Sequence, residues 1–130
     1  MGEPGFQSFK DLIVWQRSME LAAKCYSLTK VFPREEQYGM TAQIRRAATS
    51  VAANIAEGHG RESTGSFVQF LRVAQGSIKE LETHLLLAKK VGLASSDVVR
   101  LPLAECEEIG KMLRALIRTL QRKLGNGTNE

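Results

Sequence analysis

Apolar residues recur every three or four positions through most of this chain, and no segment shows the strict alternation of a half-buried strand. The clearest stripe consists of Met40, Ile44, Ala47, Ala48, Val51 and Ile55. It predicts a helix that follows a cap at Thr41 and ends near Glu57. Further alanines at positions 52, 53 and 56 flank this stripe, so a second helix can approach closely.

The same spacing predicts three more helices, over about residues 9–31, 65–91 and 95–124. Ser63 or Thr64 can cap the third helix of the chain, because a hydroxyl oxygen there can accept from the free amides of the first turn. The fourth helix carries the stripe Cys106, Ile109, Leu113, Leu116 or Ile117, and Leu120.

Proline and glycine mark the links between these helices. Pro33 suits the first turn of a short helical segment that runs through Glu36. Gly58 suits a left-handed stop of the second helix, and Gly92 suits the carboxyl-terminal cap of the third. Pro102 lies about two turns inside the fourth helix, so we expect either a kink there or a true helix start at Leu101.

Four long amphipathic segments with short links predict an all-α fold, an antiparallel up-and-down four-helix bundle. A chain of 130 residues can bury one hydrophobic core. We therefore expect a single domain over residues 9–124, with a flexible N-terminus at residues 1–8 and a flexible C-terminal tail at residues 125–130.

Some apolar residues fall outside the stripes that one bundle needs. They are Ile13, Val14, Val68 and Leu86, in the first and third helices. A monomer would expose them as patches, which favours assembly with further copies of the chain. The alternative is a thicker core.

The N-terminus lacks a basic segment followed by an apolar run, and no stretch is long and apolar enough for a membrane span, so we expect a cytoplasmic protein. Cys25 and Cys106 lie within helical patterns, which favours two buried, reduced thiols. His84 and Glu80 form a single pair at i, i+4, whereas di-iron bundles use several such groups. We predict no catalytic residue, no metal site and no cofactor.

Polar residues on the second helix predict a structural network with the third. Arg46 lies close to the packed face and can pair with Glu80 or Glu82 across the bundle, while Arg45 points further out and suits phosphate contact or a structural role equally. Asn54 can satisfy backbone groups or cross a helix or subunit interface. Glu57 ends this helix and is included in the predicted network.

The strongest nucleic-acid signal lies on the fourth helix. Cations recur there at i, i+3, i+7 and i+11, as Lys111, Arg114, Arg118 and Arg122. One interpretation is a solvated surface whose cations complement the helix macrodipole. The other is a stripe that binds phosphates, led by the backbone because aromatic residues for base stacking are scarce nearby. Arg61, beside the turn after the second helix, is a further candidate anion contact.

Several motifs in this order resemble the family called "four helix bundle protein", whose best-known members are encoded in intervening sequences of bacterial 23S ribosomal RNA genes. The motifs are QIRRAA at 43–48, SVAANIAEG at 50–58 and QGSIKELE at 75–82, with Trp15, Phe32-Pro33 and Tyr38 around them. The resemblance implies an up-and-down four-helix bundle and a ring-shaped homopentamer, with no firm function. A more distant resemblance, to the accessory protein of diversity-generating retroelements, implies a basic pentamer that works with RNA.

Together these observations predict a non-enzymatic homopentamer that binds RNA or other nucleic acid. The net charge of +4 per chain would become about +20 per ring, which suits a polyanionic partner. The candidate contacts are Arg45, Arg61, Lys111, Arg114, Arg118 and Arg122. The alternative is a protein–protein scaffold or adaptor with no nucleic-acid role.

Overall fold

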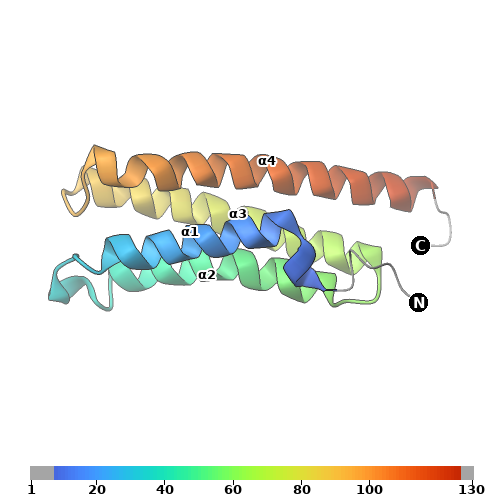
Figure 1. The fold of residues 1–130 in the computed structure, drawn as a ribbon, viewed down its shortest axis with the longest axis horizontal. Coiled ribbons are helices and arrows are strands. Elements are labelled where there is room, and N and C mark those ends of the chain that lie inside the picture. Colours follow the sequence, from blue (N-terminus) through green and yellow to red (C-terminus); the bar gives the residue numbers. More distant parts are fainter. Residues whose placement is uncertain (1–7, 127–130) are drawn as a thin grey trace.

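The computed structural model describes residues 8–126, and within that range every regular element is helical. The long helices are α1 (Ile13–Thr29), α2 (Met40–His59), α3 (Thr64–Lys90) and α4 (Ser96–Asn126). Two short 3₁₀ turns, η2 (Phe9–Asp11) and η3 (Arg34–Glu36), precede α1 and α2. The helices run alternately in opposite directions with short links, so the predicted all-α, up-and-down four-helix bundle is confirmed (Figure 1).

Each helix packs on the two that neighbour it in the bundle. α2 lies against α1 and α3, and α4 lies against α3 and α1, so α2 and α4 occupy diagonal corners. Figure 1 shows that the carboxyl-terminal end of α4 reaches past the ends of the other helices. The last turns of α4 therefore extend beyond the other three helices of the described chain.

The core follows the predicted stripes. Its largest fully buried side chains come from all four helices and include Leu21, Ile44, Ile55, Leu71, Ile78, Leu81, Leu85, Ile109 and Leu113. Each such side chain stabilises the fold by about 1.5–3 kcal/mol through removal of apolar surface from water. In α4, Ile117 rather than Leu116 takes the buried position.

The first predicted helix is interrupted near its start and ends early. Ser8 accepts a hydrogen bond from the Lys10 amide, which supports η2 instead of a continuous helix from Phe9. Leu12 then has an extended backbone, with φ −77° and ψ 123°. The Phe9 ring packs edge-on against Trp15, with 5.1 Å between ring centroids, so the chain folds back here. α1 ends at Thr29 rather than Val31.

The ends of α2 differ from the predicted ones. Thr41 does not cap this helix, because the Met40 amide donates instead to the Glu36 carboxylate at 3.0 Å. α2 also continues through Gly58 to His59, and Gly58 has no positive φ. Gly58 is buried against Phe67 and Phe70 of α3. Its role is therefore close packing between helices, and the predicted left-handed stop is wrong.

Both ends of α3 follow the prediction. Ser63 is the cap, and its hydroxyl oxygen accepts from the Ser66 amide at 3.0 Å. At the other end Gly92 has φ +86°, and its amide donates to the Lys89 carbonyl at 3.1 Å. The Leu93 amide donates to the Ala88 carbonyl at 2.8 Å, which completes a Schellman motif.

α4 begins at Ser96, so the predicted alternative of a true start at Leu101 is wrong. The Ser95 hydroxyl oxygen accepts from the Val98 amide at 3.2 Å and caps the first turn. Pro102 lies inside the helix and lacks the amide that would donate to the Val98 carbonyl. Val99 and Pro102 are both buried, and this packing holds the first two turns in place. The helix also includes Gly125 and Asn126, which the sequence places in the tail; residues 1–7 and 127–130 lie outside the described range.

The apolar residues that fall outside the predicted stripes are of two kinds. Val14 and Val68 are buried within the chain, as a thicker core requires. Ile13 and Leu86 are 59% and 51% exposed, and they belong to the surface.

Candidate nucleic-acid interface

The four cations predicted on the fourth helix lie together on its outer side. We call Lys111, Arg114, Arg118 and Arg122 the α4 basic face. All four are exposed, and they alternate with the buried residues that turn toward the core, such as Leu113 and Ile117. Within residues 8–126 none of the four takes part in a salt bridge. Their charges are therefore available to a ligand.

The two ends of this face have different surroundings. Lys111 lies on a shallow surface shared with Glu107 and Glu108, which reduce the local positive potential. Arg118 and Arg122 lie further along, where Lys123 adds a cation and no acidic residue follows Glu108 in the described part of α4. The positive potential therefore concentrates toward the carboxyl-terminal half of the helix.

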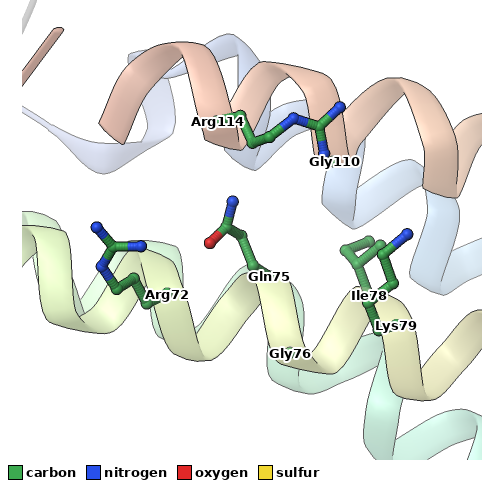
Figure 2. Close-up of a pocket in the computed structure, with 7 residues that line it drawn as sticks. All are labelled: Arg72, Gln75, Gly76, Ile78, Lys79, Gly110 and Arg114. Atoms are coloured by element: carbon green, nitrogen blue, oxygen red, sulfur yellow. The ribbon is translucent and has the colours of Figure 1, made fainter. Parts of the chain in front are cut away.

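Arg114 belongs both to the α4 basic face and to a groove between α3 and α4. This α3–α4 groove has a volume of about 360 Å³ and is lined by Arg72, Gln75, Gly76, Ile78, Lys79, Gly110 and Arg114. Figure 2 shows Gln75 projecting from α3 toward α4, between the Arg72 guanidinium on one side and the Arg114 guanidinium, which extends along α4 toward Gly110, on the other. Arg72 and Gln75 were not predicted as site residues, although their spacing with Lys79 at i, i+3 and i+7 puts all three on one helix face.

Arg45 makes its contacts within the chain. Its Nε donates to the Thr29 hydroxyl at 2.9 Å, and its Nη2 donates to the Tyr26 carbonyl at 3.3 Å. The guanidinium carbon also lies 4.4 Å from the centroid of the Tyr26 ring. Both acceptors belong to the last turn of α1, where carbonyls lack helical partners and the macrodipole favours a cation. These contacts favour the structural role that the sequence left open for Arg45.

Arg61 is exposed but also engaged. It donates to the Glu57 carboxylate at 2.8 Å, and its guanidinium lies 4.7 Å from the centroid of the Phe70 ring. The turn that carries it lies at the same end of the bundle as the carboxyl-terminal end of α4 (Figure 1). A ligand at Arg61 would have to share this cation with Glu57.

The predicted pairing of Arg46 with Glu80 is present. Arg46 donates to Glu80 and, at 2.6 Å, to Gln43, and His84 Nε2 lies 3.3 Å from the same Glu80 oxygen. The hydrogen bond from Arg46 is the main reason that the pKa of Glu80 lies below its usual value of 4.5, and His84 adds to the effect. The Arg46 side chain is 57% exposed, so this is a surface network rather than a buried ion pair.

The other predicted members of this network lie elsewhere. Glu82 pairs with Lys79 at 3.1 Å, and Glu57 pairs with Arg61. Asn54 donates to the Ser50 carbonyl at 2.8 Å, as the structural interpretation expects. The Asn54 amide also donates to the Ser50 hydroxyl at 3.0 Å.

A hydroxyl contact that was not predicted joins α2 to α3. The hydroxyls of Ser50 and Ser77 lie 2.8 Å apart, one on each helix. Ser77 is buried, so this contact supplies its hydroxyl with a hydrogen-bond partner inside the helix interface.

The thiols are buried and unreactive in character. Cys25 and Cys106 are both free and inaccessible to solvent. Burial raises the pKa of Cys25 to about 12, and the nearby Glu105 carboxylate adds to the shift. The pKa of Cys106 is raised as well, chiefly by burial. Both thiols are therefore protonated at neutral pH.

The described chain has neither a candidate metal-ion cluster nor a candidate membrane span. Among residues 8–126 no group of three or more His, Cys, Asp or Glu side chains could hold a metal ion. No helix in the same range is long and apolar enough to cross a membrane.

Comparison with known proteins identifies the family. No curated protein matched this chain. A solved structure from Bacteroides thetaiotaomicron VPI-5482, of a protein with unknown function from the S23 ribosomal protein family, is 26% identical in sequence. The two structures agree with a TM-score of 0.73 over 81% of this chain and 98% of that chain. The sequence also matches the family described as "23S rRNA-intervening sequence protein" over residues 10–115, which is most of the chain. The chain therefore belongs to the 23S rRNA-intervening sequence protein family.

Proposed function

We propose that this protein acts by binding RNA or other nucleic acid, without catalysis, through the α4 basic face of a homo-oligomer. The observation that carries the proposal is the exposed row of four cations on α4, none of which has an acidic partner within residues 8–126. Arginine forks match the geometry of phosphate oxygens, and each neutralised phosphate releases counterions.

Arg118 and Arg122 lie beyond residue 115, where the family match ends. The proposal therefore depends on the charges of this chain rather than on the family name. Because the α4 basic face contains no aromatic side chain, contacts would be made with the sugar–phosphate backbone and would carry little sequence information.

We propose that the oligomer is a pentamer, as the family resemblance implies. The surface supports assembly through an apolar groove between α1 and α2 with a volume of about 440 Å³. This α1–α2 groove is lined by Trp15, Met19, Ala22, Ala23, Tyr26, Thr49, Ala52, Ala53 and Ala56. Met19 and Tyr26 are 47% and 44% exposed, so a second copy could bury them. Light scattering on a sizing column tests this, and a mass near 14.4 kDa would refute it.

A salt titration of binding to a structured RNA tests the function. The test variant reverses three charges at the carboxyl-terminal end of α4, as Arg118→Glu, Arg122→Glu and Lys123→Glu. We expect tight native binding that weakens steeply with salt, and a large loss of affinity in this variant at low salt.

The control variant reverses three exposed lysines at the other end of the bundle, as Lys30→Glu, Lys89→Glu and Lys90→Glu (Figure 1). It changes the net charge by the same amount, so equal losses in both variants would indicate only a general charge effect. Light scattering must show one oligomeric mass for all three proteins. Absence of native binding at low salt would refute the proposal and favour the protein–protein scaffold.

A further inference from the structure

The α3–α4 groove has the size and the charge of an anion site. Its volume of about 360 Å³ is several times the roughly 30 Å³ that one water occupies in the liquid, so a phosphate and its bridging waters fit. Its lining includes three cations and no carboxylate. Both neighbouring helices contribute, since Arg72 comes from α3 and Arg114 from α4.

Two of these cations have no competing partner. Arg72 and Arg114 take part in no salt bridge within the described chain, whereas Lys79 is shared with Glu82 at 3.1 Å. Gln75 projects into the space between α3 and α4 (Figure 2), where its amide can donate to the same ligand. The groove therefore offers a guanidinium group on each side and an amide between them, and all three can donate to phosphate oxygens.

Two glycines leave the groove open, although the fold does not require a glycine at either position. A Cβ at Gly76 would meet no atom within 4 Å, and a Cβ at Gly110 would make only ordinary contacts, at 3.9 Å with Arg114 and 4.0 Å with Ile78. Neither has a positive φ. A helical glycine costs about 0.5–1 kcal/mol relative to alanine. Their missing side chains instead let a ligand approach the helix backbones closely.

We propose that the α3–α4 groove binds a phosphate group of the nucleic-acid backbone between Arg72 and Arg114. This inference rests on the proposed function and deepens it, because Arg114 belongs to both the groove and the α4 basic face. A nucleic-acid strand that follows the α4 basic face would place one phosphate in the groove. This contact would fix the position of the strand across the bundle. Arg118 and Arg122 would contact phosphates further along the strand.

Two variants test the groove by different means. Arg72→Gln removes one cation, and Gly76→Leu fills the groove without a change of charge. Both sites are exposed, so the fold should persist in each. The matched controls are Arg100→Gln, at an exposed arginine near the start of α4, and Ala42→Leu, at an exposed alanine of α2.

Binding of a single-stranded RNA is measured across a salt series, with light scattering on every variant. We expect Arg72→Gln to weaken binding about fivefold and to reduce the slope of log K against log salt by about 0.7–1. Gly76→Leu should weaken binding by a similar factor, and both controls should bind like the native chain.

The outcomes separate this inference from the proposed function. If the charge reversal at Arg118, Arg122 and Lys123 abolishes binding but Arg72→Gln and Gly76→Leu bind normally, the groove inference is wrong and the function stands. If Gly76→Leu changes the oligomeric mass, the groove is a contact between subunits and the inference is also wrong.

Inorganic phosphate distinguishes a backbone phosphate from a free one. If the native chain binds no RNA, both the function and the backbone ligand are refuted. Saturable phosphate binding that Gly76→Leu abolishes would then assign the groove to a small phosphate ligand instead. If the native chain binds neither RNA nor inorganic phosphate, the groove has no ligand and the proposed anion site is refuted.

Discussion

Gly58→Ala tests the close approach of α2 to α3 at Gly58. A Cβ added to Gly58 would lie 2.6 Å from the Phe70 Cβ and 3.0 Å from the Phe67 Cδ1. Carbon atoms pack best at about 3.5–4.0 Å, and the Phe70 Cβ is attached directly to the α3 backbone, so the helices must move apart. Overpacking of this kind costs about 1–3 kcal/mol. The alanine also restores about 1 kcal/mol of helix propensity, so the net change relative to the native chain runs from about zero to a loss of about 2 kcal/mol.

Urea unfolding at equal protomer concentration measures this loss. Gly76→Ala is the matched control, because it adds the same methyl group to a helix where a Cβ meets nothing within 4 Å. We expect the control to gain up to about 1 kcal/mol and Gly58→Ala to be about 1–3 kcal/mol less stable than the control, with a melting temperature several degrees below that of the control. If Gly58→Ala is as stable as Gly76→Ala or more stable, the close approach of α2 to α3 is wrong.

Three further predictions concern groups inside the chain. Arg45→Ala should cost about 1–2 kcal/mol of unfolding free energy and Arg118→Ala almost none, as measured by urea unfolding, because only Arg45 donates to the end of α1. Cys25 and Cys106 should resist a thiol reagent at about pH 8 and react fully in denaturant, because burial disfavours both thiolates. Rapid labelling of the folded chain would contradict this. Because the pKa of Glu80 is lowered, the contribution of its carboxylate to stability is present at neutral pH and is lost as pH falls through that pKa. The stability difference between the native chain and Glu80→Gln should therefore shrink in acid, and a constant difference from pH 7 to about pH 3 would contradict this.

The sequence predicts the helices well because their signals are local. The i, i+3 and i+4 stripe of α2 and the glycine after α3 act within a few residues, and both have their predicted roles. Gly58 shows where local reasoning fails. The absence of a side chain at Gly58 allows close contact with Phe67 and Phe70, which lie in another helix. Nothing in the residues next to Gly58 distinguishes a helix stop from a packing site.

The same difference between local signals and contacts between helices applies to the candidate interface. The α4 basic face could be predicted because its spacing lies within one helix. The α3–α4 groove could not, since it combines Arg72 and Arg114 from two helices whose register depends on tertiary packing. Arginines of equal charge also differ in ways that the sequence does not reveal. Arg45 and Arg61 donate within the chain, whereas Arg118 lies free on the surface.

The proposed assembly and the proposed nucleic-acid binding are compatible, because they would use different sides of the bundle. The α1–α2 groove lies on the side of the bundle opposite the α3–α4 groove, since α2 and α4 occupy diagonal corners. A subunit contact that buried Met19 and Tyr26 would therefore leave the α4 basic face exposed on every copy. Each subunit would then add its own cations to one particle, and the salt dependence of binding would increase with the number of subunits that one strand contacts.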